Sequence, residues 1–80
     1  MSDTKTSIES AVFKRLIAHL QERKEVQNID IMETAGFCRN CLSRWYKEES
    51  EKMEISITEE ESKELVYGMP YKVWKEKFQK

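Results

Sequence analysis

Apolar residues recur at helical spacing along almost the whole chain, and this periodicity limits the fold more than any other feature of the sequence. An amphipathic helix repeats every 3.6 residues or so, which gathers its apolar side chains on one half of the circumference. The first such arc contains Ile8, Val12, Phe13, Leu16, Ile17 and Leu20. Strand-like alternation occurs only at residues 54–57, which is too short for a sheet. The sequence therefore predicts an all-α fold, a compact bundle of four to five short helices.

The start of the first helix is predicted from a capping pair. Thr6 is followed three residues later by Glu9, a spacing at which the hydroxyl and the carboxylate satisfy free amides at a helix N-terminus. This pair predicts a helix over residues 8–23. We therefore expect a flexible N-terminal tail at residues 1–6 and a single helical domain at residues 7–80.

Later helices are bounded by glycine and by a second capping pair. Gly36 can adopt the left-handed conformation that ends helices, and it closes a short helix predicted over residues 29–35. Thr58 and Glu61 open a later helix, which Gly68 closes. A final helix is expected from the stripe Tyr71, Trp74 and Phe78. Between them, a strongly amphipathic helix is predicted to bury Phe37, Cys38, Cys41, Leu42, Trp45, Tyr46 and Met53.

Size and charge exclude several classes of protein. The 80 residues fit one small domain, and 14 basic against 15 acidic side chains give a formal net charge of -1. That balance provides no overall attraction for nucleic acid or for an anionic membrane. No apolar run approaches the roughly 18 residues that span a bilayer, and the first residues lack the apolar stretch of a secretory signal. We expect a cytoplasmic protein without a membrane segment.

Two stretches of the sequence carry a resemblance to a known family. They are HLQERKEVQNIDIMETAGFCRNCLSRWYKEE at residues 19–49 and LVYGMPYKVWKEKF at residues 65–78, with AGFCRNCL and YGMPY the most specific parts. Both are similar to the bacterial domain-of-unknown-function family numbered 1244. The resemblance implies a short, helical, cytoplasmic bacterial protein. It implies no activity and no role for any particular residue.

Cys38 and Cys41 form a CxxC motif just after the glycine that ends the second helix. Residues three apart lie on one face of a helix, and a helix N-terminus favours the thiolate form of cysteine. One interpretation is a redox pair, with Cys38 as the attacking thiol and Cys41 as the resolving thiol. The simplest alternative is that both are small buried apolar residues.

A metal site is a third interpretation of the cysteines. His19 is the only histidine, and its position near the edge of the first apolar arc predicts that it faces the interior. Cys38, Cys41 and His19 would then supply three ligands for zinc or iron, and a carboxylate, water or second subunit would complete the set. A second CxxC or a second histidine, the usual partner in structural zinc sites, is missing.

The segment over residues 29–47 also has the spacing of a helix-turn-helix, which offers DNA binding as an alternative function. Its second helix would present side chains of the types that reach base edges and phosphates. These residues are Arg39, Asn40, Ser43, Arg44 and Lys47. The acidic residues that begin at Glu48 would repel a duplex, so nucleic acid is not the expected partner.

The aromatic residues near the C-terminus suggest self-association. Eight aromatic side chains are a large apolar load for a domain of this size, and they either close a core or anchor an interface. We expect a homodimer that uses Tyr67, Tyr71, Trp74 and Phe78. No catalytic set can be assembled, because the carboxylates lie on polar faces and His19 has no nucleophile partner. The sequence therefore favours a small binding or interaction module over an enzyme.

Overall fold

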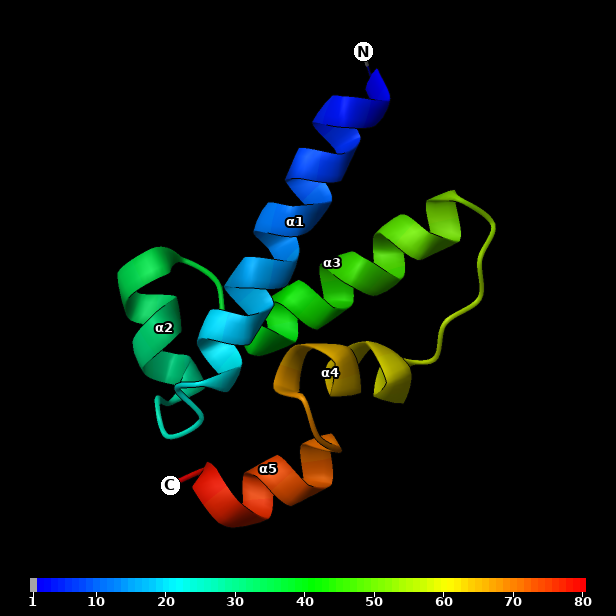
Figure 1. Ribbon diagram of the computed structural model, residues 1–80. Coiled ribbons are helices and arrows are strands. Elements are labelled where there is room, and N and C mark those ends of the chain that lie inside the picture. Colours follow the sequence, from blue (N-terminus) through cyan, green and yellow to red (C-terminus); the bar gives the residue numbers. More distant parts are fainter. Residues whose placement is uncertain (1) are drawn as a thin grey trace.

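The computed structural model describes residues 2–80, and within that range the chain forms five helices and no strand (Figure 1). The helices are α1 (Ser2–Gln21), α2 (Asn28–Ala35), α3 (Arg39–Lys52), α4 (Glu59–Tyr67) and α5 (Tyr71–Phe78). The predicted all-α class is confirmed. None of the helices described here combines the length and apolar character needed to cross a membrane.

Helix α1 starts earlier than the capping pair predicts. It begins at Ser2 instead of Ile8 and ends at Gln21, so from residue 2 onward the expected tail is helical; residue 1 lies outside the described part. Glycine and proline are absent from this stretch, so nothing in its backbone stops the helix at Thr6. Asp3 also lies in the first turn, where the helix dipole favours a negative charge.

The other helix ends follow the predicted signals. Gly36 and Gly68 have φ angles of 78° and 74°, and each donates its backbone N–H to the preceding helix. The Thr58 hydroxyl accepts a hydrogen bond of 3.1 Å from the backbone N–H of Glu61. At Gly68 an added Cβ would also lie 2.8 Å from Cδ of Gln21, so the end of that side chain would have to move. The positive φ angle is therefore the main reason for glycine at this position.

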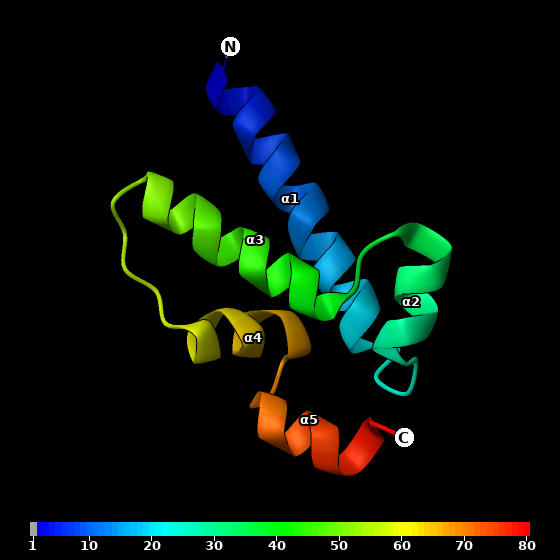
Figure 2. The same cartoon turned by 180° about the vertical axis from the view of Figure 1, so that it is seen from behind.

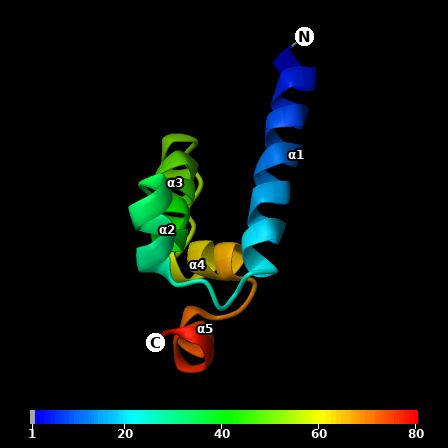
Figure 3. The same cartoon turned by 90° about the vertical axis from the view of Figure 1, so that its left-hand side faces the viewer.

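The helices form an elongated assembly with α4 near its middle. Its extents are 44 × 25 × 20 Å, and the N-terminal half of α1 projects from the body (Figures 1 and 2). Helix α3 packs most extensively on α4. The view in Figure 3 shows α4 lying across the space between the lower ends of α1 and α3, with α5 beneath it.

The core lies where the C-terminal part of α1 meets α3, α4 and α5. It consists of Ile17, Leu20, Leu42, Val66, Tyr67 and Trp74. The N-terminal half of α1 takes no part in it, since every side chain over residues 3–12 is exposed. The core therefore closes around the start of α3, the region that carries both cysteines.

The buried face of α3 differs from the predicted one. Leu42 is buried as expected, but Trp45 and Tyr46 are exposed by 42% and 37%, while Ser43 and Ser50 are buried. Each buried serine donates its hydroxyl to the carbonyl three residues earlier in the helix, so burial leaves no hydroxyl unpaired. Small side chains let α4 approach closely. The predicted buried face of α3 was therefore wrong at Trp45 and Tyr46. Small serine side chains, and not these two aromatic ones, lie on the buried side of the helix.

Candidate functional site

The two cysteines lie side by side at the start of α3. Cys38 is the N-cap residue with extended backbone, and Cys41 lies in the first turn. Their Sγ atoms are 3.8 Å apart, and both are free thiols. Cys38 is only 7% exposed, whereas Cys41 is half-buried. The accessible thiol is therefore Cys41, the reverse of the order expected for attack and resolution.

His19 does not lie in the interior. It is exposed on α1, where its Nδ1 lies 3.1 Å from Nη1 of Arg23, which also donates to the His19 carbonyl. The prediction failed because α4 and α3 cover only part of the apolar arc of α1, and His19 is at its uncovered edge. Among residues 2–80 no three His, Cys, Asp or Glu side chains are grouped so that they could hold a metal. Zinc or iron bound by Cys38, Cys41 and His19 stays a prediction.

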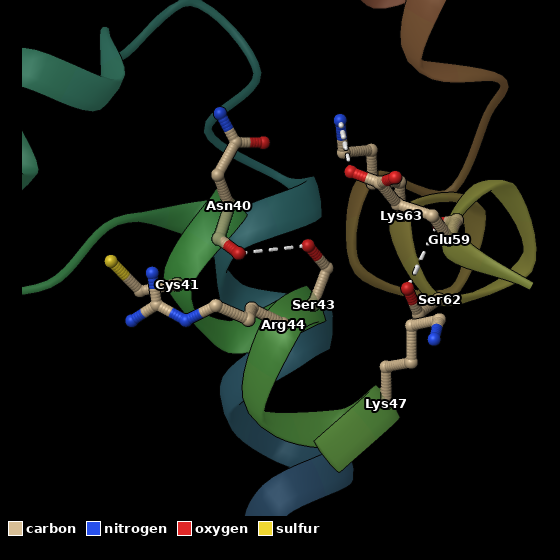
Figure 4. Close-up of a pocket in the computed structure, with 8 residues that line it drawn as sticks. All are labelled: Asn40, Cys41, Ser43, Arg44, Lys47, Glu59, Ser62 and Lys63. Atoms are coloured by element: carbon tan, nitrogen blue, oxygen red, sulfur yellow. Dashed lines mark hydrogen bonds and ion pairs between the residues drawn. The ribbon is translucent and has the colours of Figure 1, made fainter.

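A cavity of about 280 Å³ lies between α3 and α4, and Cys41 is among the polar and charged residues that line it (Figure 4). The remaining lining residues are Asn40, Ser43, Arg44, Lys47, Glu59, Ser62 and Lys63. Figure 4 shows that the Cys41 sulfur is directed away from α4, on the side of α3 opposite Lys47 and Lys63. No other cysteine borders the cavity.

The predicted DNA-contacting face of α3 is divided by its packing. Arg39 and Ser43 are each only 2% exposed, so neither side chain is available to a duplex. Asn40 and Lys47 line the cavity against α4, and Arg44 is exposed beside them. The assignment of Arg39 and Ser43 to an outer surface was wrong, because α4 and α5 cover that side of α3. DNA binding through the remaining residues is an untested prediction.

Arg39 instead fastens the loop after α1 to the core. Its Nη1 donates to the Val26 carbonyl at 2.7 Å and to Asn28 Oδ1 at 3.0 Å, and its Nη2 donates to the Arg23 carbonyl at 2.7 Å. The guanidinium carbon lies 5.2 Å from the ring centroid of Trp74. Burial lowers the pKa of Arg39, because water no longer solvates the charge. Its role is structural, and a helical wheel gives no signal for it.

Tyr67 joins the same polar network. Its hydroxyl accepts a hydrogen bond from Asn28 Nδ2 at 3.0 Å and donates to Asn40 Oδ1 at 2.8 Å. Burial raises the pKa of Tyr67 to about 12, since the phenolate would lose its hydration. These hydrogen bonds connect α2, α3 and α4, and the two α3 residues that take part, Arg39 and Asn40, lie between the cysteines in sequence.

The raised pKa of Tyr67 predicts a loss of stability at high pH. An unfolded tyrosine ionises near pH 10, and in the folded chain the pKa is about 12. The contribution is complete below pH 10 and is lost as pH rises through 12, a loss of about 3 kcal/mol. Urea unfolding at several pH values should show this decline in the native protein and a shallower one in Tyr67→Phe. Equal slopes for the two proteins would contradict it.

The C-terminal aromatic residues close the chain's own core. Tyr67 and Trp74 are exposed by only 2% and 1%, and their ring centroids are 5.0 Å apart. Tyr71 and Phe78 pack against them and are half-buried. Tyr67 and Trp74 thus belong to the core of the single chain, whereas Tyr71 and Phe78 keep part of their surface exposed. The homodimer expected through this region stays a prediction.

A comparison with known protein families covers the cysteines, the cavity and the C-terminal helices. A family model described as Protein of unknown function (DUF1244) matches residues 26–80, more than half of the chain. The match spans α2 to α5, and so includes both cysteines and every residue that lines the cavity. The resemblance carried by the two sequence stretches is confirmed. No curated protein sequence matches the chain.

Proposed function

We propose that this chain, which belongs to the family described as Protein of unknown function (DUF1244), is a small cytoplasmic binding module that carries a reversible dithiol. The observation behind this proposal is the distance of 3.8 Å between Sγ of Cys38 and Sγ of Cys41. A disulfide needs the sulfurs at about 2.05 Å, so a modest side-chain movement would suffice. Free thiols suit the reducing cytoplasm.

The reaction is a thiol–disulfide exchange with a low-molecular-weight disulfide. The thiolate of Cys41, the more accessible sulfur, attacks one sulfur of the reagent, forms a mixed disulfide and releases one thiolate. Cys38 then loses its proton to solvent, attacks Sγ of Cys41 and releases the second thiolate. One reagent disulfide is reduced to two thiols, while the two protein thiols are oxidised to one disulfide.

The dithiol is supported over the two other candidates by what surrounds it. A metal site requires further ligands that the described part of the chain does not group with the cysteines. A DNA-binding face would lose two of its five expected residues to the interior. Thiol–disulfide exchange with a small reagent requires no protein residue besides the two cysteines.

The test uses reduced protein, bis(2-hydroxyethyl) disulfide and intact-mass measurement. The native protein should lose the mass of two hydrogen atoms and both titratable thiols. Cys38→Ser should stop at the mixed disulfide on Cys41, and Cys41→Ser should react much more slowly, because Cys38 is buried. The proposal fails if the folded native protein stops at a mixed disulfide or keeps both thiols while the urea-unfolded chain reacts. It also fails if freshly purified protein holds stoichiometric zinc or iron whose removal releases the thiols.

A further inference from the structure

We propose that the rings of Phe37 and Trp45 form an aromatic platform beside the accessible thiol, and that this platform selects low-molecular-weight disulfides that carry an aromatic ring. The inference rests on the exchange reaction proposed above and adds the class of reagent. It is carried by the position of the two rings at the turn of α3 that holds Cys41.

The Cys41 thiol faces the side of α3 that is away from α4. Its sulfur lies opposite Lys47 and Lys63 in Figure 4, so a reagent reaches it from that side and not through the cavity. Trp45 follows Cys41 by four residues, a spacing that makes two side chains neighbours on one helix face. Trp45 is also 42% exposed. The accessible thiol and an exposed indole therefore share one side of the helix.

The two rings of the platform meet over the turn that contains Cys41. The ring centroids of Phe37 and Trp45 are 6.1 Å apart. Phe37 precedes the first residue of α3, whereas Trp45 lies in its second turn, so the indole must lean toward the helix N-terminus to reach Phe37. Long side chains of a helix point in this direction and cover the preceding turn. For Trp45 the preceding turn holds Cys41, which places the indole beside the thiol.

An aromatic reagent gains a contact at this platform that an aliphatic reagent lacks. Exchange brings the attacked sulfur to Sγ of Cys41, and the group bonded to that sulfur then lies against whatever borders the thiol. Stacking on a partly exposed ring is favourable for a flat aromatic group. The Cys41 thiolate forms the mixed disulfide with one half of the reagent, whose ring rests on Trp45, and the other half leaves as an aromatic thiolate.

Tyr46 provides a contrast on the same helix. It is exposed by 37%, close to the value for Trp45, but its ring stacks on Phe13 of α1 with the centroids 6.2 Å apart. Tyr46 follows Cys41 by five residues, which corresponds to a rotation of roughly 140° about the helix axis. Of these two exposed aromatic residues, Trp45 is therefore the one that lies on the side of the thiol.

The test compares two uncharged disulfides on the folded, reduced protein. One is 4,4′-dithiodipyridine, which carries two aromatic rings, and the other is bis(2-hydroxyethyl) disulfide, which carries two short aliphatic groups. Intact mass measures the loss of reduced protein with each reagent. The ratio of the two rates is divided by the same ratio for the urea-unfolded chain, which removes intrinsic reactivity. We expect a normalised ratio of about five in favour of the aromatic reagent, the effect of one aromatic contact.

A probe that cannot exchange gives an independent readout. The thioether 4-(methylthio)pyridine has the same ring and no disulfide, so it can contact the platform without reacting. It should change the tryptophan fluorescence of the reduced protein saturably, and Trp45→Ala should abolish this change, because Trp74 is only 1% exposed. A response that rises linearly with concentration and survives in Trp45→Ala would show collisions alone and would count against the platform.

Matched variants locate the effect on the exchange rates. Trp45→Ala should lower the normalised ratio to about one, and Trp45→Phe should keep most of it, because a ring remains. Tyr46→Ala removes a ring of similar exposure from α3 and should leave the ratio unchanged. A ratio near one in the native protein, or equal falls in the two alanine variants, would overturn the inference; the dithiol proposal would stand if both reagents still form the protein disulfide. Failure of both reagents to form it would overturn both proposals.

Discussion

Replacing Arg39 with methionine is expected to lower the free energy of unfolding by about 3–5 kcal/mol, a large share of the stability of a domain this small. The guanidinium makes three hydrogen bonds to the Arg23 and Val26 carbonyls and to Asn28 Oδ1. Methionine has a similar length and no donor, so these partly buried acceptors would lose their partners. Equilibrium unfolding in urea measures the difference.

Arg44 provides the matched control for Arg39. It is on the same helix, its side chain is 63% exposed, and its one ion pair with Glu48 is 3.9 Å long. Arg44→Met should therefore change the free energy of unfolding by less than about 0.5 kcal/mol. Lysine at position 39 should recover only part of the loss, because a single ammonium cannot reach acceptors that a planar fork spans. Equal losses for the two methionine variants would show that Arg39 has no special structural role.

The contrast between these two arginines shows where sequence information ends. On a helical wheel both belong to the polar side of α3, and the sequence predicted both as surface residues. Whether a polar side chain is buried depends on which helix covers it and which acceptors that helix supplies. For Arg39 those acceptors come from the loop after α1 and from the first residue of α2, 11 to 16 residues away in sequence. Such a network leaves no periodic signal.

Three local signals at helix ends were predicted well, although the capping pair Thr6 and Glu9 gave the wrong start for α1. The ends at Gly36 and Gly68 and the start at Thr58 depend on backbone conformation and on one nearby hydrogen bond, both set by neighbouring residues. The proximity of Cys38 and Cys41 also follows from a spacing of three residues. Their unequal burial does not, since it depends on how α3 meets the rest of the chain.

Features that depend on packing between helices were predicted poorly. His19 was expected inside because a wheel assumes that the whole apolar arc of a helix is covered, and α1 projects from the body. The sequence did not predict the cavity that Cys41 helps to line. Its lining joins residues of α3 with Glu59, Ser62 and Lys63 of α4, and the pairing of these two helices cannot be read from either one alone.

Trp74→Ala is expected to cost about 3–5 kcal/mol, comparable to the loss of Arg39. Trp74 is 1% exposed, and its Nε1 donates to the Lys24 carbonyl at 3.0 Å. It is the one fully buried side chain of α5, and a helix of eight residues cannot persist without tertiary contacts. Removing the indole should therefore undock α5 from the loop after α1. Hydrogen exchange should then show early loss of protection in α5.

Trp45 is the matched control, because it is 42% exposed on α3. Trp45→Ala should cost about 1 kcal/mol, and Trp74→Phe should lie between the two alanine variants, since it keeps apolar volume but loses the hydrogen bond. Arg39 contacts the face of the Trp74 ring, so a double-mutant cycle between them should give a coupling energy above about 0.5 kcal/mol. Additive losses, or equal costs for the two tryptophans, would mean that α5 is held by something other than this contact.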